Sequence, residues 1–424
     1  MRWGRMYHKT ILDNGMRIIS EEIEHVRSIS IGIWVECGSR YEDDQTNGSA
    51  HFIEHMLFKG TERRTAFDIA STIDSVGGVM NAFTSKELTA FYIKIPDYHL
   101  ALAIDLLADI FNHSRFDEDE ITKEKSVVLQ EISMLEDSPD DYIHDFFEAN
   151  FWKHNHLGMQ VLGTRERVEG FSRDSLLKFF RSRYRGRNVV LTAAGHLKHE
   201  TLVELAEKAF GGMGEDTEKV TFILPTAVST SITVLEKDLE QVHMMIGTLA
   251  PSSVSENRHA SFLMNAVLGG SMSSRLFQEI REKRGLAYAI HSYLTPYIDT
   301  GMLAVYVGTG KGEVREVLGL ILDELMRMAK QPLTAKELHG AKELIKGNFL
   351  LSMESTDNRM TRLAKNEICY GRHVPTEDVV TKIDAVAHEH IQELAQEMFN
   401  PSTISIAAIG PVSEKDLTLH VLNG

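Results

Sequence analysis

The chain has 424 residues, more than one ordinary hydrophobic core accommodates, so two or more domains are expected. Its formal net charge of -16 disfavours nucleic acid as a partner, because phosphate binding needs a basic surface. Two cysteines far apart indicate neither a disulfide framework nor a thiolate metal site, and no apolar run predicts a membrane span. The N-terminal segment lacks the apolar stretch of a secretory signal, so we expect a cytoplasmic location.

Strand-like and helix-like patterns are mixed along the chain. Asp13-Asn14-Gly15 is typical of a tight turn between two strands. Apolar runs predict strands at 29–36, 88–95, 188–195, 243–250, 301–309 and 404–410. Amphipathic patterns predict helices at 98–113 and 312–329. Neighbouring strands interspersed with helices favour an α+β fold with largely antiparallel sheets.

The chain repeats itself at a spacing of about 215 residues. RYRGRNVVLTAAGH at 183–196 parallels MFNPSTISIAAIGP at 398–411. Likewise 116–132 parallels 333–349, and both segments begin with a helix-capping signal. Because the matching segments occur in the same order, we infer duplication rather than chance similarity. The prediction is two duplicated halves facing each other.

The domain boundaries follow from this repeat. A glycine-rich, charged stretch that contains a proline predicts a linker at 214–230. The predicted domains are therefore 1–213 and 231–424.

The sharpest chemical signal is HFIEH at 51–55. Residues four apart share one face of a helix, so His51 and His55 can present two imidazoles to one cation. Glu54 lies on an adjoining part of that surface. There its carboxylate can take a proton from a metal-bound water as that water attacks a substrate. The motif alone is only moderately specific, and two histidines on a solvated helix face are the alternative. The acidic stretch 42–44 is interpreted as a polar loop, with steering of basic peptides as an alternative.

A second predicted helix at 117–136 carries Glu124 and Glu131 two turns apart. Apolar residues between and beside them indicate that part of this helix is buried. A buried glutamate needs a partner, and a metal or a metal-bound histidine would supply one. Glu124 could equally pair with Lys123 or Lys125 at the surface.

Three stretches are more specific in combination: HFIEHMLFKGT at 51–61, GGVMNAFTSKELTAFY at 77–92 and EKSVVLQEI at 124–132. Together they resemble the inverted-zincin peptidases, and more narrowly the catalytic subunit of mitochondrial processing peptidase and its short bacterial relatives. The resemblance extends over nearly the whole chain.

This resemblance implies that His51, His55 and Glu131 hold one Zn2+ per chain. It implies Glu54 as the catalytic base and Glu124 as a supporting catalytic acid that orients the site. The first domain is then the catalytic, metal-binding one.

The same resemblance implies two pairs of substrate-binding residues. Asn81 and Ala82 match edge-strand residues that hold a peptide as an added β-strand beside the metal. Arg281 and Tyr288 match a catalytic pair that binds the substrate carbonyl and stabilises the oxyanion. Without the resemblance, Asn81 would be an ordinary strand-turn residue and Arg281 part of a basic helix end.

The second half lacks these metal-binding residues. At an offset of 217 residues, Ala341 and Asn348 stand where Glu124 and Glu131 stand, and no second HxxEH motif occurs. The second domain is therefore expected to be a degenerate homologue that contributes substrate-binding residues. The resembled noncatalytic subunits carry a long glycine-rich loop, and 268–277 is only modestly glycine-rich, so a homodimer is expected.

The sequence thus predicts a zinc-dependent endopeptidase that hydrolyses extended peptides or leader segments. The alternative is a noncatalytic structural or peptide-binding subunit of the same fold. Such subunits lose a histidine or glutamate of the site, whereas this chain keeps all of them. Cobalt and manganese stay open as metals, because a site of two histidines and one carboxylate accepts several divalent ions.

Overall fold

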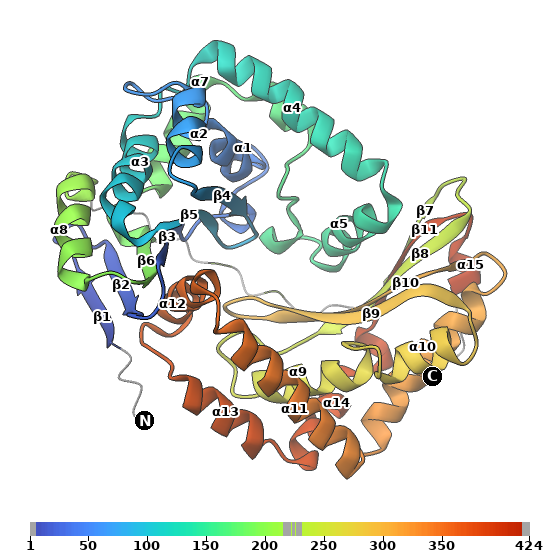
Figure 1. Ribbon diagram of the computed structural model, residues 1–424. Coiled ribbons are helices and arrows are strands. Elements are labelled where there is room, and N and C mark those ends of the chain that lie inside the picture. Colours follow the sequence, from blue (N-terminus) through green and yellow to red (C-terminus); the bar gives the residue numbers. More distant parts are fainter. Residues whose placement is uncertain (1–5, 215–221, 223–224, 226–230, 418–424) are drawn as a thin grey trace. The chain divides into compact units, whose positions relative to one another are not determined.

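The computed structural model describes residues 6–214, 222, 225 and 231–417 (Figure 1). Most of the predicted linker, 214–230, therefore lies outside the described residues. The chain divides into two compact units, each with its own sheet. Unit 1 comprises Met1–Ser133, Met159–Phe222 and Ser352–His373, and unit 2 comprises Met134–Gly158, Ile223–Leu351 and Val374–Gly424.

Unit 1 is built on a six-stranded sheet with the order β1-β2-β6-β3-β5-β4. Its strands are β1 (Met6–Ile11), β2 (Arg17–Glu22), β3 (Ser28–Val35), β4 (Val79–Thr84), β5 (Thr89–Pro96) and β6 (Val189–Gly195). The predicted turn at Asp13-Asn14-Gly15 joins β1 to β2, and Gly15 has a φ of 83°, which glycine adopts without strain. β4 is an edge strand, so one side of its backbone has no neighbouring strand within this sheet.

Helices cover both faces of this sheet (Figure 1). They are α1 (Ser49–Met56), α2 (Ala66–Asp74), α3 (Leu100–His113), α4 (Glu118–Glu136), α6 (Arg165–Gly170), α7 (Arg173–Arg183), α8 (His199–Phe210) and α12 (Thr356–Tyr370). Phe52 of α1 and Leu107 of α3 are fully buried in the core on one face. On the other face, Trp34 packs with Met360 and Leu363 of α12. The sheet is thus buried on both faces.

Unit 2 has a five-stranded sheet with the order β7-β11-β8-β10-β9. Its strands are β7 (Ile232–Glu236), β8 (Gln241–Leu249), β9 (Ala287–Pro296), β10 (Gly301–Gly310) and β11 (Ser405–Gly410). Its helices are α5 (Pro139–Phe151), α9 (Arg258–Leu268), a π-helix (Phe277–Glu282), α10 (Val314–Lys330), α11 (Ala335–Ser352), α13 (Thr376–Ala385), α14 (His388–Met398) and α15 (Glu414–Leu417). Ile143 and Phe147 of α5 pack on one face of the sheet, and α9, α10 and α14 share the core on the other.

The two sheets confirm the predicted duplication and the α+β fold class. Five strands of unit 1, in the order β2-β6-β3-β5-β4, correspond one by one to β7-β11-β8-β10-β9. In each sheet one strand pair is parallel and the others are antiparallel. Gly195 and Gly410, which end the matching strands β6 and β11, have φ angles of 144° and 142°. The repeat is therefore preserved down to a backbone conformation that favours glycine.

The units exchange one helix each across the repeat. α5 lies in the first half of the sequence and packs on β8 and β11 of unit 2. α12 lies in the second half and packs on β2, β3 and β6 of unit 1. The compact units are therefore interleaved along the chain, whereas 1–213 and 231–424 follow the repeats in the sequence.

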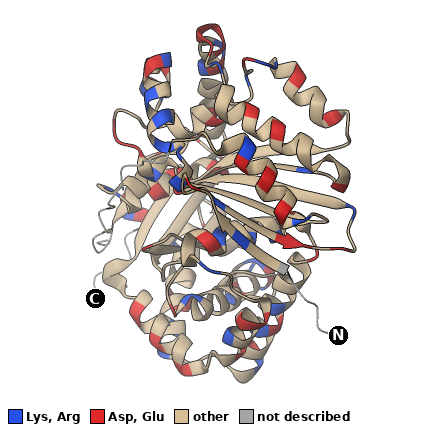
Figure 2. Cartoon of the chain, turned by 90° about the vertical axis from the view of Figure 1, so that its left-hand side faces the viewer, with Lys and Arg blue, Asp and Glu red and all other residues tan. Residues whose placement is uncertain are grey.

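The acidic excess is distributed over many helices, with basic residues among them (Figure 2). On α4, for example, the ammonium of Lys123 lies 2.6 Å from the carboxylate of Glu120. Among the helices that the structure describes, none is both long and apolar enough to cross a lipid bilayer.

Candidate metal centre

Helix α1 places both histidines of the motif on one face. Phe52 and Ile53 are fully buried in the core of unit 1, which fixes the orientation of the helix. The rings of His51 and His55 lie with their centroids 4.5 Å apart. The spacing of four residues therefore brings the imidazoles together, as the motif predicts.

The N-terminus of α1 is held by a buried carboxylate. Residues 42–44 lie in a polar loop before α1, as interpreted, but Glu42 is buried in it and only 1% exposed. Its carboxylate accepts hydrogen bonds from the N–H groups of Gly48 (2.8 Å) and Ala50 (2.7 Å). Burial raises the pKa of Glu42 to about 8. The oxygens of this carboxyl group satisfy helix N–H groups that otherwise have no partner, and so fix where α1 begins.

Helix α4 brings Glu131 to the two histidines. The Oε2 atom of Glu131 lies 3.8 Å from Nε2 of His51 and 3.8 Å from Nε2 of His55. In a tetrahedral zinc site with bonds of roughly 2.0–2.2 Å, ligand atoms stand about 3.4 Å apart. Within the described part of the chain, this is the one group of three or more such side chains whose ligand atoms converge.

Two polar atoms of this cluster test whether a cation fits. Glu131 Oε2 and His51 Nδ1 are both buried, and neither has a hydrogen-bond partner among the described residues. A buried polar atom left without a partner costs about 1–3 kcal/mol, and a cation between carboxylate and imidazoles would satisfy the oxygen. Burial, together with the neighbouring His55, lowers the pKa of His51 to about 3, so this imidazole is neutral and available for coordination. The side chains therefore fit a divalent cation.

Glu124 orients one of the histidines. It is 2% exposed, and its Oε1 lies 2.8 Å from Nδ1 of His55, which leaves Nε2 to face Glu131. Its other oxygen lies 2.6 Å from the ammonium of Lys59. Burial alone would raise the pKa of Glu124, but the hydrogen bonds with His55 and Lys59 outweigh it and hold the pKa below its usual range. The carboxylate is thus charged and fixes the tautomer and orientation of His55.

Lys59 is a site residue that the sequence analysis missed. Neither lysine proposed as a partner of Glu124 contacts it: Lys123 pairs with Glu120, and Lys125 donates to the carbonyl of Glu169. Lys59 follows His55 by four residues, so helical spacing was the signal that could have identified it.

Replacing Lys59 with methionine is expected to weaken Zn2+ affinity about tenfold, because Glu124 loses the cation that holds it against His55. Competitive titration against a chromophoric chelator measures the change. Lys123→Met is the matched control, since Lys123 pairs only with Glu120 on the same helix and should leave the affinity unchanged. Equal affinity in Lys59→Met and wild-type protein would contradict this role.

Glu54 lies beside the metal ligands with a defined partner. The hydroxyl of Thr84, on β4, donates a hydrogen bond of 2.5 Å to its Oε2. Burial raises the pKa of Glu54, opposed by the Thr84 hydrogen bond and the charge of His55. Thr84, a second residue missed from the sequence, therefore fixes one carboxylate oxygen of the predicted base.

Asn81 and Ala82 lie on the edge strand β4, which also carries Thr84. They pair with Tyr92 and Phe91 of β5 on the inner side of the strand. Asn81 is exposed, and its side-chain oxygen accepts a hydrogen bond of 2.8 Å from the N–H of Ala82. The structure thus places the predicted peptide-binding pair on an edge strand of the unit that holds the metal ligands.

Arg281 and Tyr288 belong to unit 2 and lie against each other. Arg281 is in the π-helix, and its guanidinium carbon lies 5.1 Å from the ring centroid of Tyr288 and 4.8 Å from that of Phe277. Tyr288, on β9, is 80% exposed. The two side chains form a local pair, and their action on substrate stays a prediction.

The matching helix of unit 2 lacks the acidic residues. Ala341 and Asn348 lie on α11, where Ala341 is buried as an ordinary core residue. Among the residues that the structure describes, a converging group of possible metal ligands is thus present in one half of the repeat only.

Fold and site define a class: a duplicated α+β protein with a candidate metal centre. Its two histidines lie on the HxxEH helix α1 and its glutamate lies on α4. Comparison with known families agrees. The description "Insulinase (Peptidase family M16)" matches residues 17–165, and "Peptidase M16 inactive domain" matches residues 170–345. The chain belongs to peptidase family M16. The resemblance inferred from the motifs is confirmed at the level of this family.

Curated relatives match over almost their full length. The chain is 40% identical to "Uncharacterized zinc protease YmxG" of Bacillus subtilis, over 96% of this chain and 98% of that protein. It is 37% identical to an uncharacterized zinc protease of Streptomyces coelicolor, over 97% of this chain and 91% of that protein. These names support a metalloprotease.

Two solved structures share the fold. A protease from Helicobacter pylori superposes with a TM-score of 0.88 at 22% identity, over 96% of this chain and 100% of that one. A peptidase M16 inactive domain from Pseudomonas fluorescens superposes with a TM-score of 0.90 at 20% identity, over 96% of this chain and 99% of that one.

Proposed function

We propose that this chain is an endopeptidase that hydrolyses extended peptides at one Zn2+ held by His51, His55 and Glu131. The observation that carries the proposal is the unpartnered Oε2 of Glu131, 3.8 Å from a histidine nitrogen on either side. Bound there, the ion supplies Lewis acidity, which lowers the pKa of a water molecule from ~15.7 toward ~7.

Glu54 is the general base of this proposal. Thr84 occupies Oε2, so Oε1 is the atom that takes the proton of the attacking water. Because burial raises the pKa of this carboxyl, it also retains the proton better than an exposed glutamate would. The same group then passes the proton to the leaving amine, which restores the carboxylate.

Substrate contacts are assigned to both units. The free side of β4 at Asn81 and Ala82 receives an extended peptide, which gains backbone hydrogen bonds with little demand on its sequence. Arg281 and Tyr288 bind the substrate carbonyl and stabilise the oxyanion, a role that suits two polar side chains already packed together. Glu124, with Lys59, supports the site through His55.

The biological setting is inferred from charge and resemblance. The acidic surface favours peptides with basic residues, and the resemblance to processing peptidases favours leader segments as substrates. We assign the active form to a cytoplasmic homodimer, which light scattering on the purified chain would test.

Cleavage of a mixed peptide library, mapped by mass spectrometry, tests the proposed function. Products are expected from the zinc-loaded chain, none after chelation, and the same products when Zn2+ is restored. Metal bound without cleavage would indicate a peptide-binding module instead. No bound metal at neutral pH would indicate a structural subunit.

A further inference from the structure

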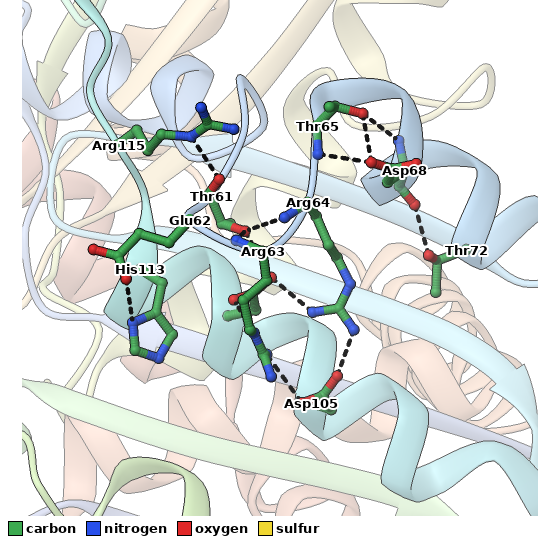
Figure 3. Close-up of polar contacts among 11 residues, drawn as sticks. Thr61, Glu62, Arg63, Arg64, Thr65, Asp68, Thr72, Asp105, His113 and Arg115 are labelled. Atoms are coloured by element: carbon green, nitrogen blue, oxygen red, sulfur yellow. Dashed lines mark hydrogen bonds and ion pairs between the residues drawn. The ribbon is translucent and has the colours of Figure 1, made fainter.

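The loop after α1 is fastened to α3 by a cluster of ion pairs (Figure 3). Asp109 of α3 is fully buried and accepts hydrogen bonds from Thr61 Oγ1 (2.8 Å), Arg63 Nε (2.7 Å) and Arg64 Nη1 (2.7 Å). Asp105, one turn earlier, binds the same two guanidinium groups at 3.0 and 2.5 Å. We call these residues the Asp109 clasp: Thr61, Arg63, Arg64, Asp105 and Asp109.

The clasp also fixes the backbone around it. Thr61 forms an isolated antiparallel bridge with Ser114, just after α3. The N–H of Arg115 donates to the carbonyl of Gly60 (3.2 Å), and its Nε donates to the carbonyl of Thr61 (2.6 Å). The N–H of Glu62 donates to the carbonyl of His113 (2.9 Å). Residues 60–62 are therefore bonded along their length to residues 113–115.

This junction lies between the two helices that carry the metal ligands. α1, with both histidines, ends at Met56, shortly before Thr61. α4, with Glu131, begins at Glu118, shortly after Arg115. Fastening the loop to the segment before α4 thus sets how α1 and α4 lie within unit 1. Lys59, next to the fastened loop, also contacts α4 directly, because its ammonium lies 2.6 Å from the carboxylate of Glu124.

The clasp depends on the charge of its buried carboxylate. Burial would raise the pKa of Asp109, but the hydrogen bonds from Arg64 and Arg63 outweigh it and hold the pKa below its usual range. Two carboxylates balance two guanidinium groups in the cluster. Neutralising Asp109 leaves an excess of positive charge beside a buried position. Movement of the loop away from α3 then lowers the free energy, because the guanidinium groups become solvated.

We propose that Asp109 is a positioning residue for the metal centre: through Thr61, Arg63 and Arg64 it keeps α1 and α4 where Glu131 meets both histidines. The inference rests on the proposed function for the nature of the site. It concerns affinity for the ion, however, and not cleavage.

Unit 2 offers a matched control. Arg275 there lies 3.0 Å from Glu324 of α10 and 2.7 Å from Glu337 of α11, and its side chain and that of Glu324 are largely buried. This is an ion cluster of similar burial in the unit that has no group of converging metal ligands among its described residues. Glu324→Gln therefore weakens a comparable cluster without touching the one proposed to act on the metal centre.

The experiment compares full-length wild type, Asp109→Asn and Glu324→Gln. Zn2+ dissociation constants come from competition with a chromophoric chelator, and Tm of the metal-free chains comes from calorimetry. Asp109→Asn is expected to weaken Zn2+ binding about tenfold, the lower end for outer-shell partners of a metal site. Glu324→Gln is expected to lower Tm by about as much as Asp109→Asn does. Its Zn2+ dissociation constant should stay within about twofold of wild type.

An unchanged dissociation constant in Asp109→Asn would overturn the inference while the proposed function stands. Equal weakening in both variants would also overturn it, because the effect would then be general destabilisation. If Asp109→Asn does not fold, Asp105→Asn decides, since it weakens the same guanidinium contacts from a carboxylate that is 45% exposed. About threefold weaker binding supports the inference and an unchanged constant refutes it. A wild-type chain that binds no Zn2+ removes both the proposed function and this inference.

Discussion

Glutamine in place of Glu54 is expected to lower the rate of peptide cleavage by roughly 10²–10⁴-fold, the usual contribution of a positioned general base. In free energy this corresponds to about 3–5 kcal/mol of transition-state stabilisation. The amide cannot take the proton of the attacking water, but it keeps the volume of the carboxyl and can still accept the hydrogen bond from Thr84. Zn2+ content should therefore stay at the wild-type level.

Two measurements on the same preparation check this expectation: single-turnover cleavage of one peptide, and metal content by mass spectrometry. Glu62→Gln is a suitable control, because the Glu62 side chain is largely exposed and lies in the loop after the same helix. A Glu54→Gln chain that cleaves at the wild-type rate would show that another group is the base. Lost cleavage together with lost metal would show that the substitution damaged the site.

Removing the charge of Glu131, the proposed third metal ligand, should reduce both Zn2+ binding and cleavage, whereas Glu54→Gln should reduce cleavage alone. In Glu131→Gln, Zn2+ occupancy is expected to fall below half at concentrations that saturate wild type, and cleavage should fall to background. The reason is that, among the described residues, Glu131 supplies the carboxylate oxygen that lies 3.8 Å from the Nε2 atoms of both histidines. An amide oxygen there is a much weaker ligand for zinc than a carboxylate.

Glu124→Gln separates the ligand from the orienting residue. It should weaken Zn2+ binding by about 10–100-fold, and added Zn2+ should restore cleavage, because Glu124 acts through His55 and does not bind the ion. Glu120→Gln, on the same helix, should change neither property, because Glu120 pairs with Lys123 and not with a histidine of the site. Wild-type Zn2+ affinity in Glu131→Gln would remove Glu131 from the site.

Much of the architecture was predictable because it depends on local pattern. The apolar runs at 29–36 and 301–309 correspond to β3 and β10, which are buried on both faces. Thr334 and Glu337 form the reciprocal cap that their spacing predicts, at the start of α11. His51, His55 and Glu131 converge because helical spacing fixes the histidines and the family motif supplies the glutamate.

The missed features depend on contacts between distant segments. β4 alternates between exposed and half-buried residues, so its apolar pattern is weak, although the proposed peptide contacts lie on this edge strand. Glu42 gave no signal of burial, because only the folded chain brings the N–H groups of Gly48 and Ala50 around it. The exchange of α5 and α12 is equally invisible, since an amphipathic helix does not specify which sheet it covers.

That exchange has a consequence for synthesis on the ribosome. The last strand of the first sheet ends at Gly195, but the helix that covers Trp34 and Val190 ends only at Tyr370. At a translation rate of roughly 5–20 residues per second, the residues between Gly195 and Tyr370 take on the order of 10–35 s to be synthesised. During that time the apolar face of the sheet that α12 covers stays exposed. Nascent unit 1 is thus expected to keep this apolar face exposed to solvent until nearly the entire polypeptide has been made.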